Sequence, residues 1–250
     1  MNIELFILAH KALDYNIPSS FKLLQLGKRL TDITLFDLND ATGDSISEKN
    51  MFFLETTGIY WIWKNIAADI KGNMQYRRFL DVKNLDICDI LKDHDIILAK
   101  PFNFGNMSIY MQYSLWHSEE DIRMLKNIIN ELYPEYVKSF VRYIEYGNTI
   151  YYSNSFICSS TTYSKICKFC FDILFEFMKR CNYDDDKILY EHAKHICDTN
   201  TFPYMNKDIK YQMHIGGALF ERLLTLYVLH NRLDIYDCGE YILKEKNMEI

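Results

Sequence analysis

The sequence has little proline or glycine and no long apolar run. Its 4 prolines and 9 glycines among 250 residues mark no linker, and no boundary between domains stands out. No apolar stretch approaches the ~18–20 residues that a membrane span requires. The opening segment "MNIELFILAHK" carries Glu4 and lacks a basic start or a small-residue cleavage site, so we interpret it as a strand and not as a signal peptide.

The chain also lacks an excess of positive charge. Its net charge of −6 disfavours a general nucleic-acid-binding protein, which needs a basic face to release counterions. Apolar residues make up 49% and charged residues 25%, the balance of a soluble globular protein. The 7 cysteines are odd in number and scattered, which indicates reduced thiols in a cytoplasmic protein.

Neither of the common phosphate-binding glycine loops is present. The chain contains no G-x-x-x-x-G-K-[ST] and no G-x-G-x-x-G segment. Any phosphate must therefore be bound by side chains and helix N-termini. Gly216-Gly217 is expected only as a flexible entry to a helix.

Hydrophobic periodicity and capping residues predict strands that alternate with helices over the first 160 residues, and mostly helices afterwards. Ser45 and Glu48 have the spacing of a capping box that opens a helix. The predicted strands are 3–9, 21–26 (for which a helix is the alternative), 70–80, 95–99, 149–159 and 233–237. The predicted helices are 48–65, 85–92, 118–133, one from Pro134, 161–180, 187–197 and 216–230.

This alternation predicts an α/β fold with a mixed, mostly parallel sheet flanked by helices and a helix-rich C-terminal part. In such sheets ligands bind beyond the carboxyl ends of the strands. His10 and Lys11 follow one predicted strand, and Arg77 and Arg78 lie at the end of another. These four residues are therefore candidates for binding an anion.

Arg77 and Arg78 stand in "QYRRFL", where a regular strand would send their side chains to opposite faces. One interpretation is a solvated arginine beside one held by a carboxylate. The other is an anion clamp, because a guanidinium offers forked donors that match phosphate oxygens. In the second interpretation Arg78, with Tyr76 on the same face, meets the anion and Arg77 braces the site from behind.

Two pairs of cysteines and histidines have spacings that metal sites use. Cys167 and Cys170 form a C-x-x-C, but they lie in a helical apolar segment without a second pair, which favours core packing. His192 and His195 are about one helical turn apart. With no further ligand identified, we expect them on a plain helix surface.

Asp93-His94-Asp95 and Asp184-Asp185-Asp186 both satisfy D-x-D, a pattern by which many sugar-nucleotide enzymes hold a divalent metal. The first precedes its strand and the second lies between helices, so we interpret both as solvated turns. Mn²⁺ or Mg²⁺ is compatible with the chain, but no ligand motif for it is convincing.

Glu221 and Arg222 interrupt the apolar helix "GGALFERLLTLYVLHN". The carboxylate is either a helix-surface residue or a partly buried acid facing a cleft. Burial would raise its pKa towards the range useful for a general base. The sequence leaves both alternatives open.

Six segments, taken in order, are similar to one known family. They are "AHK" at 9–11, "TGDSISEKN" at 42–50, "ETTGIYWIWKN" at 55–65, "GNMQYRRFL" at 72–80, "DIILAKP" at 95–101 and "GALFERLL" at 217–224. Together they resemble the capsular and exopolysaccharide biosynthesis glycosyltransferase family, long known only as a domain of unknown function, which includes galactofuranosyltransferases. The resemblance spans most of the chain and implies a GT-A-type fold.

The resemblance implies transfer of a sugar from a nucleotide-sugar donor, a UDP-sugar by preference, to a hydroxyl of a glycan acceptor. We expect a single domain over 1–250, with a Rossmann-like nucleotide-binding half at about 1–110 and an acceptor-binding half at about 111–250. Gln75 stands where the family usually has histidine, and glutamine cannot shuttle a proton. A role of that histidine as metal ligand or acid has no counterpart here.

The resemblance also suggests the site residues. Glu221 is the candidate base, by analogy with the acidic residue that inverting GT-A enzymes present from a helix. Asn154 is expected to contact a sugar hydroxyl of the acceptor, with a structural strand-end asparagine as the alternative. The predicted donor-binding residues are His10, Lys11, Asp44, Lys49, Asn50, Tyr76, Arg77, Arg78 and Arg222. Without a convincing D-x-D, the arginines and Lys11 would stabilise the departing diphosphate.

The competing hypothesis is a transferase-like module that has lost activity and binds glycan or nucleotide-sugar. Gln75 and the missing D-x-D favour this module, whereas the arginine pair and Glu221 favour the enzyme. The enzyme is expected in the cytoplasm, and at the inner face of a membrane if its glycan acceptor is lipid-linked.

Overall fold

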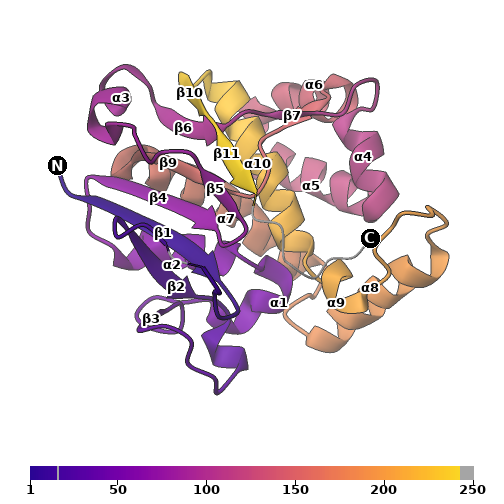
Figure 1. Cartoon of the computed structure of the whole chain (residues 1–250). Helices are drawn as coiled ribbons and strands as arrows, with labels where there is room; N and C mark the ends of the chain where they lie inside the picture. Colours follow the sequence, from indigo (N-terminus) through magenta and orange to yellow (C-terminus); the bar gives the residue numbers. More distant parts are fainter. Residues whose placement is uncertain (16, 243–250) are drawn as a thin grey trace.

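The computed structural model of the chain places a mixed β-sheet at the centre, with helices packed against it (Figure 1). It describes residues 1–15 and 17–242, so the end of the predicted domain, 243–250, lies outside the described residues. The strands are β1 (Ile3–Ala9), β2 (Phe21–Gln25), β3 (Leu38–Asn39), β4 (Ile70–Gln75), β5 (Arg78–Leu80), β6 (Ile96–Ala99), β7 (Phe102–Asn103), β8 (Thr149–Ile150), β9 (Phe156–Ser159), β10 (Ile235–Cys238) and β11 (Glu240–Ile242).

The helices follow the predicted pattern most closely in the C-terminal part, where the four long helices expected at 118–133, 161–180, 187–197 and 216–230 are confirmed. The α-helices are α1 (Asn50–Phe53), α2 (Thr56–Asn65), α3 (Ile87–Asp93), α4 (Ile109–Trp116), α5 (Glu119–Leu132), α6 (Val137–Tyr146), α7 (Ser160–Arg180), α8 (Asp186–Thr199), α9 (Ile209–Gln212) and α10 (Ile215–Asn231). Short 3-10 helices are η1 (Lys28–Leu30), η2 (Ser47–Lys49) and η3 (Pro134–Tyr136).

The sheet is mostly parallel, as predicted. Its strand order is β10-β6-β9-β4-β1-β2-β3, and β9 runs antiparallel to both of its neighbours. The other strands in this order share one direction, and β5 and β11 add an antiparallel extension beside β4. The carboxyl ends of β1, β4 and β6 therefore meet at one edge, the expected place for a ligand.

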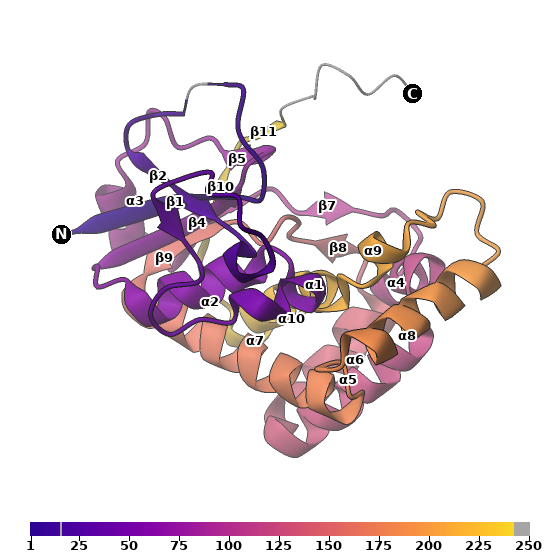
Figure 2. The ribbon, with the colours of Figure 1, turned by 90° about the horizontal axis from the view of Figure 1, so that it is seen from below.

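Strand β1 is buried on both faces, which is why its sequence is a continuous apolar run. Phe6 and Leu8 belong to the large core formed with α2, α7 and α10, the helices that lie on one side of the sheet in Figure 2. Leu5 and Ile7 face the other side, in two smaller apolar clusters. Helix α5 packs on α7 and α6 packs on α10 as an outer layer.

Two predicted strands are interrupted by turns. The predicted strand 70–80 is the antiparallel pair β4 and β5, because the chain turns at Tyr76 and Arg77. The alternation that placed Arg77 and Arg78 on opposite faces of one regular strand is therefore wrong. The predicted strand 149–159 is divided into β8 and β9 by a turn that includes Ser153, whose φ of 69° is left-handed.

The predicted helix 48–65 is also divided, at Leu54, whose φ is 51°. The predicted capping box does not form, because the hydroxyl of Ser45 donates to the carbonyl of Asp40 and the Glu48 carboxylate pairs with Arg29 at 3.2 Å. These polar groups stabilise the loop before α1 and leave the helix start uncapped by a side chain.

Gly216 is part of α10 and is not a flexible entry to it. A Cβ atom at this position would lie 2.6 Å from the ring of Phe52, so glycine allows α10 to pack closely against α1. This contact fixes the start of the helix that carries Glu221.

Candidate active site

Glu221 projects from α10 into a cavity of about 760 Å³. Its side chain is 15% exposed, and Oε1 accepts a hydrogen bond of 2.8 Å from the backbone N–H of Ser153. Burial raises the pKa of this carboxyl to about 7; Glu55 adds to the increase, and Arg222 and Arg78 oppose it. Of the two alternatives that the sequence left open, the structure has the partly buried acid facing a cleft.

Arg222 lies beside Glu221 and lines the same cavity, but the protein itself holds its guanidinium. Nη1 donates to the carbonyl of Ala218 at 2.6 Å, and Nη2 donates to the amide oxygen of Gln112. The guanidinium carbon is 4.9 Å from the centre of the Tyr113 ring. The positive charge of this buried guanidinium interacts favourably with the carboxylate of Glu221. A contact of Arg222 with a donor stays a prediction.

Arg78 lines this cavity as well, from the first position of β5. Its guanidinium is 3.8 Å from the carboxylate of Glu240 and 6.0 Å from the centre of the Tyr152 ring. The side chain is 40% exposed. The structure therefore brings Glu221, Arg222 and Arg78 together.

A second group of predicted residues surrounds the ring of Tyr76. The His10 ring is 5.2 Å away in an edge-on contact, the Lys11 ammonium is 5.3 Å from the ring centre, and the Arg77 guanidinium is 5.2 Å from it. We call His10, Lys11, Tyr76 and Arg77 the Tyr76 cluster. It lies at the carboxyl ends of β1 and β4, and its converging basic groups suit an anion.

Glu55 interacts electrostatically with Arg77 of the Tyr76 cluster and with Glu221 of the cavity, and it is a candidate that sequence reasoning missed. It is 6% exposed, and Oε1 accepts hydrogen bonds of 2.8 Å from the side-chain amides of Gln75 and Asn154. Oε2 is buried without a hydrogen-bond partner in the described part of the chain. Burial raises the pKa of this carboxyl. The signal available in the sequence was the acid that opens "ETTGIYWIWKN".

Asn154 is fully buried between Glu55 and α10, where its amide also donates to the carbonyl of Gly217 at 3.2 Å. Its φ of 50° is left-handed, a conformation that asparagine tolerates. This is the environment of a structural asparagine, the alternative stated above. A contact with an acceptor hydroxyl stays a prediction.

The sequence matches, over residues 4–194, the family described as Domain of unknown function (DUF4422). The chain belongs to this family. The fold is also similar to a solved structure described as the apo structure of WbbM, a bifunctional glycosyltransferase, with a TM-score of 0.77 at 22% sequence identity. The match covers 98% of this chain and 46% of that one, so the chain spans about half the length of its structural relative. No curated protein matches the chain.

These comparisons confirm the predicted fold class, a mostly parallel α/β sheet consistent with a GT-A-like fold. The family match confirms the resemblance at the level of a family known as a domain of unknown function. The side-chain amide of Gln75 donates a hydrogen bond of 2.8 Å to Glu55.

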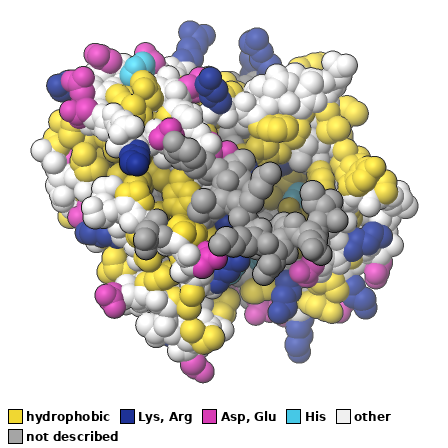
Figure 3. Space-filling model, in the orientation of Figure 1, with side chains coloured by type: hydrophobic (Ala, Val, Ile, Leu, Met, Phe, Trp, Pro, Cys, Tyr) yellow, Lys and Arg dark blue, Asp and Glu magenta, His cyan; other side chains and the backbone are white. Residues whose placement is uncertain are grey.

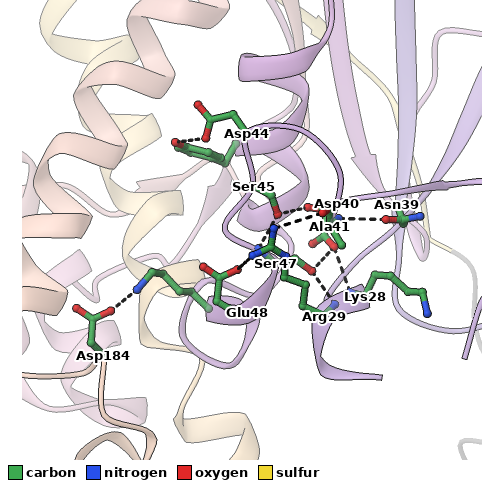
Figure 4. Close-up of polar contacts among 12 residues, drawn as sticks. Lys28, Arg29, Asn39, Asp40, Ala41, Asp44, Ser45, Ser47, Glu48 and Asp184 are labelled. Atoms are coloured by element: carbon green, nitrogen blue, oxygen red, sulfur yellow. Dashed lines mark hydrogen bonds and ion pairs between the residues drawn. The ribbon is translucent and has the colours of Figure 1, made fainter. Parts of the chain in front are cut away.

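Asp44 is not brought to the cavity. Its carboxylate accepts a hydrogen bond of 3.0 Å from the Tyr60 hydroxyl (Figure 4). Its backbone N–H donates to the side-chain oxygen of Asn65 at 2.9 Å. Asn65 ends α2, whereas Glu55 precedes that helix, and ten helical residues span about 15 Å. The position of Asp44 does not support the predicted contact with a donor, which stays a prediction.

Lys49 and Asn50 are likewise occupied by structural contacts. Lys49 forms an ion pair with Asp184, which links the loop before α1 to the loop before α8 (Figure 4). The Asn50 amide donates to the carbonyl of Leu54 at 2.7 Å and to the hydroxyl of Thr57 at 2.9 Å, across the break between α1 and α2. Their contact with a donor also stays a prediction.

The C-x-x-C motif follows its structural interpretation, whereas His192 does not lie on a plain helix surface: its side chain is 23% exposed and its ring centroid is 5.2 Å from that of Tyr183. Cys167 and Cys170 are buried free thiols, and burial raises the pKa of each well above its ordinary value. Within residues 1–15 and 17–242, no group of three or more His, Cys, Asp or Glu side chains is arranged to hold a metal ion. Binding of Mn²⁺ or Mg²⁺ stays a prediction.

Two broader properties also bear on function. No helix in the described part of the chain combines the length and apolar character that crossing a membrane requires. Figure 3 shows acidic, basic and hydrophobic side chains interspersed on the face of Figure 1, with no single sign of charge dominating it. This face is unlike the basic surface that nucleic-acid binding requires.

Proposed function

We propose that the chain transfers a sugar from a nucleotide-sugar donor, a UDP-sugar by preference, to a hydroxyl of a glycan acceptor in polysaccharide biosynthesis. The observation that carries the proposal is Glu221, a carboxyl with a pKa of about 7 in a cavity next to the carboxyl edge of the sheet. The family match and the likeness in fold to a glycosyltransferase support it. From the cysteine content we expect the reaction in the cytoplasm.

In this proposal the Tyr76 cluster binds the donor diphosphate and Glu221 acts on the acceptor. Glu221 takes the proton of the acceptor hydroxyl as that oxygen attacks the anomeric carbon. The bond from this carbon to the diphosphate oxygen breaks, and its electron pair leaves with the diphosphate. Basic groups around Tyr76 stabilise the charge that develops there, which is usually the largest catalytic contribution.

The distance between the Tyr76 cluster and Glu221 suits a sugar held between them. His214 directly precedes α10, and burial together with His10 lowers its pKa to about 4. Glu221 is seven residues further along the same helix, a rise of about 10 Å. The first half of the chain, about 1–110, would thus bind the nucleotide, and α10 would present the base to the acceptor.

The second candidate is a module without activity that binds glycan or nucleotide-sugar. Gln75 favours it, because a residue that cannot shuttle a proton holds Glu55 at the centre of the site. This module would keep the cavity and the Tyr76 cluster and lack turnover.

A panel of UDP- and GDP-sugars tests the two candidates. Thermal shift reports binding, and release of the nucleoside diphosphate reports hydrolysis or transfer, each measured with and without Mn²⁺. The transferase is supported if one donor both binds and turns over with a glycan acceptor. Binding without turnover on any acceptor supports the inactive module, and no binding by any donor overturns both.

A further inference from the structure

Aromatic side chains line the cavity beyond the residues considered so far. The rings of Phe102, Phe104 and Tyr152 contact one another, with centroids 5.1, 5.5 and 5.9 Å apart. We call these three residues the aromatic wall. Trp116 and Phe202, whose ring centroids are 5.7 Å apart, also line the cavity. Phe102 is 53% exposed even though it lies in the paired strand β7.

One exposed ring and four partly buried rings in one cavity need an explanation, because hydrated apolar surface is unfavourable. The polar lining of the same cavity includes Glu221, Glu240 and Arg78. Carboxylates accept hydrogen bonds from hydroxyls, and the guanidinium donates them. The cavity therefore combines an apolar wall with groups that bind hydroxyls, the arrangement expected of a small-molecule site.

This combination fits a sugar better than a nucleotide. A pyranose ring has an apolar face of C–H bonds that can lie on an aromatic ring, and hydroxyls around its edge. The cavity mixes the carboxylates of Glu221 and Glu240 with basic side chains (Arg78, Lys100 and Arg222), whereas the Tyr76 cluster brings Lys11 and Arg77 to one ring and is the better match for a diphosphate. The cavity volume of about 760 Å³ is in the range of sites that enclose drug-sized ligands, enough for the end of an oligosaccharide.

We propose that the aromatic wall binds a pyranose residue of the acceptor glycan and directs one of its hydroxyls to Glu221. The inference rests on the proposed function and names the acceptor as a pyranose-containing glycan. Phe102, the exposed member of the wall, makes the stacking contact. Its truncation to alanine should weaken sugar binding about 3–10-fold, the effect of losing one ring-stacking contact.

Saturation-transfer NMR tests the aromatic wall without a donor, because it detects bound sugars through their C–H protons. The full chain is titrated with methyl β-glucopyranoside, methyl β-galactopyranoside, lactose and cellobiose. Saturation is expected to reach the ring protons of at least one of these four sugars. The Phe102→Ala variant should bind that sugar about 3–10-fold more weakly. Tyr190→Ala is the matched control, since Tyr190 on α8 is 43% exposed and does not line this cavity. The affinity of the Tyr190→Ala variant for the sugar should equal that of the wild type.

Titration of UDP into the same samples separates this inference from the proposed function. If none of the sugars binds, or if Phe102→Ala binds them as well as the wild type, the wall is not a sugar subsite, whatever UDP does. If Phe102→Ala loses affinity for UDP and keeps it for sugars, the wall holds a nucleobase and the inference is overturned. If sugars bind through Phe102 and UDP does not bind, the sugar subsite stands and the preference for a UDP-sugar in the proposed function falls.

Discussion

The backbone N–H of Ser153 donates a hydrogen bond of 2.8 Å to Oε1 of Glu221. The left-handed φ of 69° at Ser153 belongs to the turn that divides β8 from β9. The donor therefore comes from outside α10 and fixes one oxygen of the carboxylate, while Oε2 lies 3.5 Å from the Arg222 guanidinium. A base held in this way is oriented before the acceptor arrives, which is what positioned proton transfer requires.

The pH dependence of turnover should follow the pKa of Glu221. Burial raises this pKa to about 7, so the carboxyl carries its proton below that pH and is able to accept one above it. We expect kcat to rise with pH through about 7 and to level off above it. The measurement is kcat with saturating donor and acceptor across this range, and a flat profile would exclude a base with this pKa.

Glu55 should stabilise the fold through its two amide donors. Glu55→Ala leaves the side-chain amides of Gln75 and Asn154 without their acceptor in a buried site, a loss of about 1–3 kcal/mol in the free energy of unfolding. Glu55→Gln keeps an acceptor oxygen and serves as the control. Urea denaturation measures both variants; equal stability of the alanine variant and the wild type would contradict this account.

Replacing Arg77 or Arg78 by alanine should have different effects on the affinity for the donor. Arg77 belongs to the Tyr76 cluster, whereas Arg78 lines the cavity with Glu221. We expect Arg77→Ala to weaken UDP binding about 10–100-fold, as for loss of a charge-assisted contact, and Arg78→Ala to weaken it less. This reverses the roles that regular strand alternation predicted.

Isothermal titration with UDP measures both arginine variants. Arg123→Ala is the matched control, because Arg123 is an exposed arginine that pairs with Glu119 and Glu120 on the surface of α5. A larger loss of affinity for Arg78→Ala than for Arg77→Ala would contradict this account and would support the assignment from strand alternation, in which Arg78 meets the anion.

Much of the architecture could be predicted because it depends on short-range periodicity. Helices such as α5 and α7 carry an apolar face with the helical repeat, and β1 is a continuous apolar run. The β4–β5 turn at Tyr76 and Arg77 could not be predicted, because "QYRRFL" contains no glycine, proline or asparagine to signal a turn.

The candidate site was predictable only in part, for a related reason. Glu221 was recognisable as an acid in an apolar helix, and His10 and Lys11 as residues that follow a strand. Glu55 was not recognisable, because its partners Gln75 and Asn154 lie 20 and 99 residues away along the chain. Such long-range contacts leave no local pattern in the sequence.

Asp121 should make the protein less stable as the pH rises. It is 3% exposed, it accepts a hydrogen bond of 2.8 Å from the Tyr113 hydroxyl, and burial raises its pKa from 3.8 to about 7. Between these values the folded state keeps a proton that the unfolded state has lost, so the free energy of unfolding falls as pH increases through this window. Glu221 contributes with the same sign.

Asp121→Asn removes the ionisable group and keeps an acceptor for Tyr113. Urea denaturation at about pH 5 and about pH 8 should show the variant gaining stability relative to the wild type at the higher pH, by up to about 2–4 kcal/mol. An identical difference between the two proteins at both pH values would show that Asp121 is already ionised at the lower one.

Glu221→Gln tests the central claim most directly. Glutamine keeps the size of the side chain and an oxygen for the Ser153 N–H, but it cannot accept the proton of the acceptor. The measurement is nucleoside diphosphate release with donor and acceptor present, together with the Kd for UDP, with Glu145→Gln as the control, because Glu145 is an exposed carboxylate on α6 outside the cavity. The account predicts a loss of about 10²–10⁴-fold in kcat with an unchanged Kd. Turnover equal to that of the wild type in folded Glu221→Gln would contradict it.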